Sequence, residues 1–252
     1  MGSEYWDAVL LDHYLLDAPW LERVMASRAV IDDLANRPLP CNLLIDPTLG
    51  RSAAAYAHLV PEPCKLLLGP RFAMMRPQFM AARPEALTRR SQWDGRVTRV
   101  LIALGGGAFA DLALRLAVAV RARGLAPVVL GPKPTGNLVP AGLDWIAHSE
   151  DVAPMMIDCD VGIGGAGGMS WERACLGQPA IAVVLAANQA GIAKGLDEAG
   201  AAMASPPDAD AVLAALDRLL ADPAALKRMS ARASAITDGA GAERVCDALE
   251  AL

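Results

Sequence analysis

The segment that decides the fold reads DVGIGGAGGMSWE over residues 160–172. Its first residues, Asp160 to Ile163, form a strand-length run, and the glycine-rich turn from Gly164 to Gly168 follows at once. Helix-forming residues resume at Trp171. A buried strand that ends in glycines and continues as a helix is typical of a parallel sheet with crossover helices. The segment therefore predicts an α/β fold.

The residues of this turn suit a diphosphate joined to a ribose. Glycines such as Gly167 and Gly168 let phosphate oxygens approach the backbone, and the unpaired amides of the helix that follows add donors. Ser170 can contribute a hydroxyl donor, and the Glu172 carboxylate, about one turn into the helix, can accept hydrogen bonds from two ribose hydroxyls. The alternative is a tight strand-to-helix connection in which Ser170 caps the helix and Glu172 compensates its dipole.

A second glycine turn, Gly105-Gly106-Gly107, follows the buried run from Val97 to Leu104. Two such turns in one sheet would lie side by side at its carboxyl edge, where open α/β sheets bind ligands. Taken alone, this turn is as well explained by steric need. It is neither a G-x-G-x-x-G dinucleotide motif nor a P-loop, because no Gly-Lys-Ser/Thr follows. NAD and ATP are therefore disfavoured, and no cofactor is predicted.

Short β-rich runs alternate with longer helical segments, as in parallel sheets joined by crossover helices. The expected strands are Ala8 to Leu11, Ala29 to Ile31, Asn42 to Ile45, Lys65 to Leu68, Val97 to Leu104, Val128 to Leu130, Trp145 to Ile146, Val161 to Ile163 and Ile181 to Leu185. A segment rich in proline and arginine ends in Trp93-Asp94-Gly95 and indicates a covering helix and linker. We therefore expect two Rossmann-like domains, residues 1–95 and 96–252.

Composition excludes several classes of protein. The 252 residues are 54% hydrophobic, and a formal net charge of −5 with only 23 Lys+Arg disfavours nucleic acid as a partner. No apolar run approaches the roughly 20 residues that cross a bilayer, and no secretory signal is evident, so a cytoplasmic protein is expected. Five scattered cysteines and three histidines lack metal-ligand spacing, which predicts no metal site and cysteines that are small core residues.

Three further polar groups follow predicted strands. In Asp12-His13-Tyr14, His13 could act as an acid or base and Tyr14 as a donor, although an isolated triplet is more often packing. Asp32-Asp33 could be a paired-carboxylate site, but a turn or N-cap role explains it at least as well. Asn188-Gln189 could read sugar hydroxyls or amides, with helix capping by Asn188 as the alternative.

At these residues the chain resembles a known family, the UDP-sugar hydrolases of pseudaminic acid biosynthesis, which release UDP from 2,4-diacetamido-2,4,6-trideoxy-β-L-altropyranose. The matching stretches run in order over most of the chain: Leu10 to Tyr14, Ile31 to Arg37, Leu67 to Ala73, Gly164 to Gly168 with Ser170 to Arg173, and Asn188-Gln189. Together they are far more specific than any one of them.

The resemblance implies a GT-B-like fold of two Rossmann-type domains. By this likeness residues 96–252 bind UDP through Gly105, Gly106, Gly167, Gly168, Met169, Ser170 and Glu172, while the sugar meets Tyr14, Asn188 and Gln189. Water would attack the anomeric carbon while UDP leaves. No metal is implied, because helix dipoles and backbone donors stabilise the departing diphosphate.

The sequence departs from the family pattern in two places. Family members begin with a further strand, glycine turn and helix carrying a G-x-G-H-x-x-R-type motif, whose histidine is thought to be the catalytic base. This chain starts after it, so the base cannot be assigned. The first domain is expected to be incomplete, with an apolar edge that something must cover, so that either the chain is a fragment or another subunit, such as a second copy, supplies cover. In addition, Ala108 and Asp111 differ from the usual residues after the first glycine turn.

Three functions follow from this reading. The leading hypothesis is a UDP-sugar hydrolase-like protein, impaired by truncation, with Tyr14 and His13 as the catalytic candidates. The alternatives are a GT-B-type UDP-sugar glycosyltransferase and a non-catalytic nucleotide-sugar binding protein.

Overall fold

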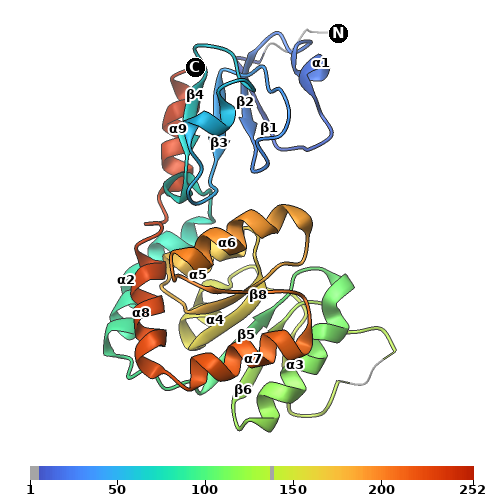
Figure 1. Cartoon of the computed structure of the whole chain (residues 1–252), viewed down its shortest axis with the longest axis vertical. Coiled ribbons are helices and arrows are strands. Elements are labelled where there is room, and N and C mark those ends of the chain that lie inside the picture. Colours follow the sequence, from blue (N-terminus) through green and yellow to red (C-terminus); the bar gives the residue numbers. More distant parts are fainter. Residues whose placement is uncertain (1–5, 137–138) are drawn as a thin grey trace. The chain divides into compact units, whose positions relative to one another are not determined.

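The computed structural model describes residues 6–136 and 139–252, and its chain divides into two compact units (Figure 1). Unit 1 comprises the chain up to Met74 together with Ala240–Leu252, and unit 2 is Met75–Gly239. Each unit is built on its own parallel sheet, so the expected two-sheet α/β architecture is confirmed. In the described chain no helix is both long and apolar enough to span a bilayer.

The sheet of unit 1 has four parallel strands in sequence order. They are β1 (Ala8–Leu11), β2 (Ser27–Ile31), β3 (Leu43–Asp46) and β4 (Lys65–Leu68). Short helices connect them: α1 (Ala18–Leu21), the 3-10 turn η1 (Ala53–Tyr56) and, after β4, the turn η2 (Pro70–Phe72). One face of the sheet packs Leu44 against Leu39 and Tyr56.

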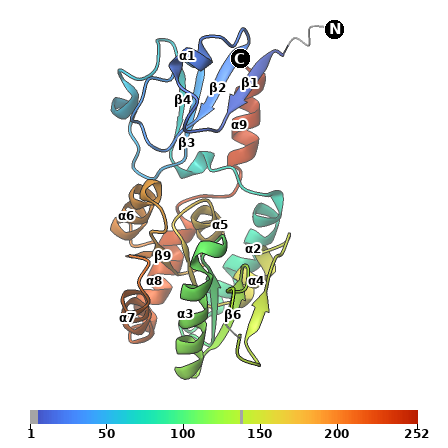
Figure 2. The same ribbon diagram turned by 90° about the vertical axis from the view of Figure 1, so that its right-hand side faces the viewer.

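The other face of this sheet is covered by the last helix of the chain, α9 (Gly241–Glu250), which lies along the strands in Figure 2. Val245 and Ala248 pack against Leu43 and Ile45 there. The start of α9 passes so close to Ala73 that a Cβ at Gly241 would collide with its backbone. This helix therefore completes the core of unit 1, although it was expected in the second domain.

The boundary between the units also differs from the one expected near residue 95. Helix α2 (Pro77–Gln92) belongs to unit 2 because its arginines bind that unit's backbone and side chains. The buried Arg90 donates to the carbonyls of Met156 and Cys159 at 2.9 and 2.7 Å, and Arg89 pairs with Asp160 at 2.9 Å. The sequence predicted a covering helix and linker for this segment, and α2 is that helix, packed on unit 2.

Unit 2 contains a six-stranded parallel sheet in the order β10-β9-β8-β5-β6-β7. Its strands are β5 (Arg99–Ala103), β6 (Ala126–Leu130), β7 (Asp144–Ile146), β8 (Val161–Gly165), β9 (Ala180–Val183) and β10 (Met203–Ser205). Its helices after α2 are η3 (Gly107–Phe109), α3 (Ala110–Ala122), α4 (Ala153–Asp158), α5 (Met169–Cys175), η4 (Ala187–Gln189), α6 (Ala190–Glu198), α7 (Ala209–Leu220) and α8 (Pro223–Ser234). Strands β1 to β9 correspond to the nine expected strands, whereas β10 was not predicted.

The strand order of unit 2 reverses at its centre. From β5 the chain moves outward through β6 and β7, then returns to β8 on the other side of β5 and moves outward again through β9 and β10. The core beneath this sheet packs Leu116 of α3 and Val212 of α7 against Ile102 and Ile163. In open α/β sheets, ligands bind at the carboxyl ends of the two strands where the order reverses, here β5 and β8.

Candidate functional site

A pocket of about 420 Å³ opens at this reversal point. The register pairs Ala103 of β5 with Gly164 of β8, so the two glycine turns that follow these strands are neighbours. Gly105 to Gly107 line the pocket from one turn, and Gly167 to Met169 line it from the other. The prediction that the two turns lie side by side at the carboxyl edge is thereby confirmed.

Glycine is needed in these turns for more than one reason. Gly105 has φ +78°, in the left-handed region that favours glycine. At Gly106 and Gly168 no neighbouring heavy atom lies within 4 Å of the position that a Cβ would take. Since both residues line the pocket, side chains at these two positions would occupy it. The turns are thus built so that the backbone itself forms the pocket wall.

Gly164, in contrast, is required by packing inside the protein. A Cβ at this position would collide with the guanidinium of Arg173 and lie 2.9 Å from the Ala103 carbonyl oxygen. Arg173 is 3% exposed and lies under the turn, where its Nη2 donates to the Gly165 carbonyl at 2.7 Å. Burial lowers the pKa of Arg173 to about 10, which still leaves it cationic at neutral pH. A buried positive charge therefore supports the turn from inside the fold.

Ser170 makes different contacts from those predicted. Its hydroxyl is buried, accepts from Arg173 Nη2 at 3.1 Å and approaches the Gly165 carbonyl at 3.5 Å. The side chain braces the turn from inside and does not line the pocket. It is not the N-cap of α5 either, because Gly168 takes that place. A phosphate contact through the Ser170 hydroxyl remains a prediction.

Glu172 follows Met169 by three residues on α5, one turn further along the same helix. The residue is 9% exposed, and its Oε1 accepts from Arg76 Nη2 at 3.3 Å. Its Oε2 is buried and accepts no hydrogen bond from the described chain. Burial raises the pKa of Glu172, and the guanidinium groups of Arg76 and Arg173 oppose that rise. A buried carboxylate oxygen without a donor is rare, and the hydroxyl group of a ligand could supply the missing hydrogen bond.

Arg76 was not singled out from the sequence. It is the residue before α2, and its Nη1 donates to the carbonyl of Glu150 at 2.7 Å while Nη2 pairs with Glu172. The only sequence signal was its place among the arginines between Pro70 and Pro84. An arginine that shares one oxygen of Glu172 fixes the carboxylate and leaves the other oxygen for a ligand.

Gln189 lines the pocket, but its amide oxygen is already used within the fold. Oε1 accepts from the amides of Leu185 at 3.0 Å and Ala166 at 3.2 Å, which ties the loop after β9 to the glycine turn. Its Nε2 lies 3.4 Å from the position that a Cβ on Gly167 would take. Asn188 is half-buried beside it in η4. The structure thus makes Gln189 a brace of the pocket wall, and sugar recognition by this pair stays a prediction.

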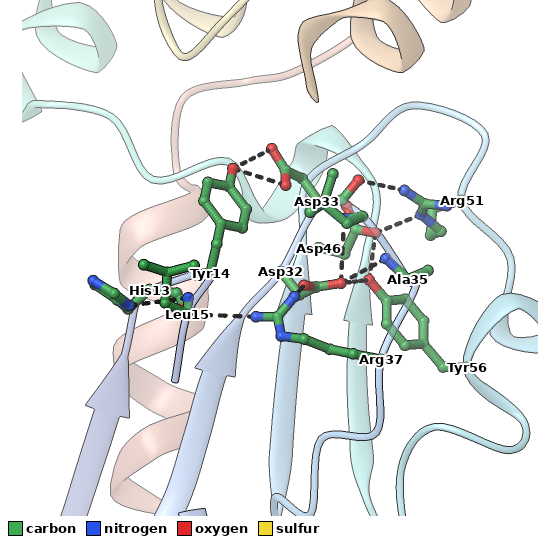
Figure 3. A network of polar contacts seen from close by, with 11 residues as sticks. His13, Tyr14, Leu15, Asp32, Asp33, Ala35, Arg37, Asp46, Arg51 and Tyr56 are labelled. Carbon is green, nitrogen blue, oxygen red and sulfur yellow. Dashed lines mark hydrogen bonds and ion pairs between the residues drawn. The ribbon is translucent and has the colours of Figure 1, made fainter. Parts of the chain in front are cut away.

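The candidates of unit 1 lie at the carboxyl ends of β1 and β2 (Figure 3). The Tyr14 hydroxyl points at Asp33 and lies 2.9 and 3.0 Å from its two carboxylate oxygens. His13 is exposed, and its Nδ1 accepts from the Leu15 amide at 3.1 Å. Because Nδ1 is an acceptor here, the neutral ring carries its proton on Nε2. This geometry suits His13 to donating a hydrogen bond, whereas the sequence left both acid and base roles open.

Asp32 and Asp33 do not form a paired-carboxylate site, because the two side chains have different partners. Asp32 is 1% exposed and takes the alternative role, since its Oδ2 accepts from the amides of Leu34 and Ala35 at 3.2 and 2.7 Å. Its other oxygen pairs with Arg37 at 2.8 Å. The turn interpretation of Asp32 is therefore the one the structure supports.

A buried network continues from Asp32 to the end of β3 (Figure 3). The Tyr56 hydroxyl lies 2.9 Å from Asp32 Oδ2 and 2.8 Å from Asp46 Oδ2. Arg51 donates through Nε to Asp46 at 2.5 Å and through Nη2 to the Asp33 carbonyl at 2.6 Å. Burial and the two neighbouring carboxylates raise the pKa of Tyr56. This network fixes the loops after β2 and β3, and the sequence did not reveal it.

The cysteine prediction holds for three of the five residues. Cys41, Cys159 and Cys175 are buried, whereas Cys64 is half-buried and Cys246 is exposed on α9. Among the residues that the structure describes, no group of three or more histidine, cysteine or acidic side chains could hold a metal ion.

The protein has two units, each built on a parallel sheet, and one of them carries a pocket where its strand order reverses. These are features of a GT-B glycosyltransferase fold, and comparison with solved structures agrees. The chain is similar to MurG of Acinetobacter baumannii, with a TM-score of 0.65 and 16% identity over 98% of this chain and 74% of MurG. No protein-family model matches the sequence, and a comparison with curated proteins gives no match.

Two further solved structures are glycosyltransferases. SsfS6 of Streptomyces sp. SF2575, complexed with thymidine diphosphate, gives a TM-score of 0.57 and 18% identity over 96% of this chain and 69% of its own. The spinosyn rhamnosyltransferase SpnG, complexed with spinosyn aglycone, gives 0.56 and 18% identity over 88% and 68%. At these identities the likeness shows the fold. The neighbours are transferases, so the hydrolase family suggested by the motifs gains no support from them.

Proposed function

We propose that this chain is a GT-B-type protein that binds a UDP-sugar through unit 2 and transfers the sugar to an acceptor. The observation that carries the proposal is the buried, unpartnered Oε2 of Glu172, one helical turn beyond a pocket walled by two glycine turns. A nucleoside diphosphate matches both features, because its phosphates suit bare backbone and its ribose hydroxyls suit a carboxylate.

The diphosphate would lie against Gly106 and the second turn. In that turn the Ser170 amide donates to the Gly167 carbonyl, and the Trp171 amide donates to the Gly168 carbonyl. The amides of Gly167, Gly168 and Met169 therefore come before the hydrogen-bonded part of α5. The buried charge of Arg173 lies behind them. Positive potential at this point favours the extra negative charge of a departing diphosphate, which is the main electrostatic demand of sugar transfer.

Unit 1 supplies the candidates for contact with the sugar or the acceptor. The Tyr14–Asp33 pair combines a hydroxyl with a carboxylate, and His13 adds a ring donor. An acceptor hydroxyl must lose its proton as it attacks, and a carboxylate held within reach can take it. We assign Tyr14 and His13 to binding and orientation of the sugar, and unit 1 to the sugar side that the sequence suggested for the amino-terminal domain.

Hydrolysis is the second candidate, with water as the acceptor. The observation that favours it is the ordered set of motifs, from Leu10–Tyr14 to Asn188-Gln189, that resembles the hydrolases acting on UDP-2,4-diacetamido-2,4,6-trideoxy-β-L-altropyranose. Both reactions need the same UDP site, so they differ only in what attacks the anomeric carbon.

Isothermal calorimetry with UDP tests the shared part of both proposals. We expect a saturable heat of binding, and no binding at millimolar UDP would overturn both. Product analysis then separates them. Dependence of UDP release on an added acceptor supports transfer, and free sugar without any acceptor supports hydrolysis. Tight UDP binding with neither product would leave a nucleotide-sugar binding protein.

A further inference from the structure

Unit 1 holds two thiols in direct contact. Cys41 precedes β3 and Cys64 immediately precedes β4, which is the strand next to β3. Their Sγ atoms are 3.7 Å apart. The backbone beside them is already joined, because the Lys65 amide donates to the Asn42 carbonyl at 2.8 Å.

The two thiols have unequal surroundings. Cys41 is 1% exposed and packs with Leu39, Leu44 and Tyr56, whereas Cys64 is half-buried at the margin of the same cluster. The hydrogen-bond contact between the two thiols lowers the pKa of Cys64, and the same contact together with burial raises the pKa of Cys41. The more accessible thiol is thus also the more acidic one, which is the arrangement of an attacking thiol backed by a resolving thiol.

The distance allows a bond without moving the sheet. A disulfide brings the sulfurs to about 2.05 Å, so the pair must close by roughly 1.7 Å. Rotation of two side chains just before neighbouring parallel strands can supply such a shift. Because Cys41 is enclosed, an external reagent meets Cys64 first.

We propose that Cys41 and Cys64 form a reversible disulfide by exchange with a small-molecule disulfide. The Cys64 thiol releases its proton to solvent, and its sulfur attacks one sulfur of the reagent, whose other half leaves as a thiolate. That thiolate takes the Cys41 proton, and the Cys41 sulfur attacks Cys64 and displaces the second half, which is protonated from solvent. Two protein thiols are oxidised, and one small disulfide is reduced to two thiols.

The cross-link would restrain the part of unit 1 that carries the polar network. It joins the chain before β3 to the chain before β4, and Cys41 shares its cluster with Tyr56. Closing this loop limits the unfolded chain, so we expect the oxidised form of unit 1 to melt at a higher temperature than the reduced form.

Oxidised glutathione is the probe. The purified wild-type chain is incubated with it, alkylated and digested with trypsin, which cleaves after Arg28, Arg51 and Lys65 but not at Arg37, because Pro38 follows. We expect a cross-linked pair of peptides, residues 29–51 and 52–65, that separates on reduction. Wild-type protein that keeps a stable glutathione adduct on Cys64, or leaves both thiols free, would overturn the proposal.

Two variants assign the order of attack, and Cys246 in the same samples reports ordinary exposed reactivity. In Cys41→Ser we expect the glutathione adduct to accumulate on Cys64, since nothing resolves it. In Cys64→Ser we expect Cys41 to stay unmodified while Cys246 reacts. Modification of Cys41 in that variant at the rate of Cys246 contradicts the order of attack. The wild-type cross-link decides the proposal even where a variant folds poorly.

Discussion

The carboxyl edges of the two parallel sheets differ in whether their polar groups have partners within the protein. In unit 1 the edge is filled by the chain's own charges, because Asp32 and Asp46 are each paired with an arginine and share the Tyr56 hydroxyl. In unit 2 the edge carries glycines around an open pocket, and one carboxylate oxygen of Glu172 has no donor.

This difference separates polar groups that stabilise the fold from polar groups that are available to a ligand. A buried carboxylate that is paired with an arginine contributes to folding, whereas a carboxylate oxygen without a donor beside an open pocket can bind a ligand. We therefore expect substitutions at the filled edge to affect unfolding and substitutions at the open edge to affect nucleotide binding. The four predictions below test that division, from the largest expected effect to the smallest.

Asp46→Ala should cause the largest effect, on stability. It removes the carboxylate that pairs with Arg51 and lies within hydrogen-bond distance of the Tyr56 hydroxyl, and breaking such a buried pair costs about 3 kcal/mol or more. Urea unfolding followed by circular dichroism measures the loss. Asp217→Ala is the matched control, since its pair with Arg123 lies at the surface and should change stability by under about 1 kcal/mol. Equal losses in the two variants would show that the unit 1 network is not structural.

Glu172→Ala should weaken UDP binding by about tenfold to a hundredfold, as expected for a lost hydrogen bond to a charged group. Because the proposed role is contact with ribose, its thermal unfolding should change little. Titration calorimetry measures the affinity, and Glu198→Ala, which removes an exposed carboxylate of α6, is the control. Affinity within twofold of wild type in Glu172→Ala would remove the basis of the ribose assignment.

Two glycine substitutions of equal size should have opposite effects. Gly106→Ala adds a methyl group to open space beside the pocket, so UDP affinity should fall severalfold while stability is kept. Gly164→Ala adds the same group against Arg173 and Ala103, so unfolding free energy should fall by about 1 to 2 kcal/mol. The experiment is calorimetry and urea unfolding on both proteins. A stability loss in Gly106→Ala as large as that in Gly164→Ala would refute the distinction.

The smallest effect concerns pH. Burial raises the pKa of Glu172 in the folded protein, so the folded state holds its proton in a window above the ordinary value of about 4.3. Unfolding free energy therefore falls as pH rises through that window. Compared with Glu172→Gln, the wild type should be equally stable at low pH and less stable at neutral pH. The reverse trend would mean that Arg76 outweighs burial.

Most strands could be predicted from sequence because buried parallel strands are continuous apolar runs. The expected run Ala8 to Leu11 coincides with β1, and Lys65 to Leu68 coincides with β4. Strand β10 was missed because its three residues, Met203–Ser205, are too few and too weakly apolar to stand out beside two alanine-rich helices. The position of α9 could not be predicted either, because local pattern does not show which sheet a helix covers.

For the candidate site, the sequence predicted the position of the glycine turns but not the contacts of the side chains. Glycines after β5 and β8 indicated a shared pocket, since adjacent strand ends must meet. Side-chain direction was beyond reach, so the hydrogen bond that the Ser170 hydroxyl accepts from Arg173 was not predicted. The buried network of unit 1 was equally hidden, because Tyr56 lies far in sequence from Asp32 and carries no motif.

The return of the chain at Ala240–Leu252 has a practical consequence for gene design. Unit 2 is one continuous stretch of sequence, Met75–Gly239, whereas unit 1 consists of two segments, one before and one after that stretch. A premature stop codon near Ala240 would therefore spare the coding sequence of unit 2 and still expose the sheet face of Leu43 and Ile45. For the same reason, unit 1 should be expressed alone only after Met74 has been spliced to Ala240 by a designed linker.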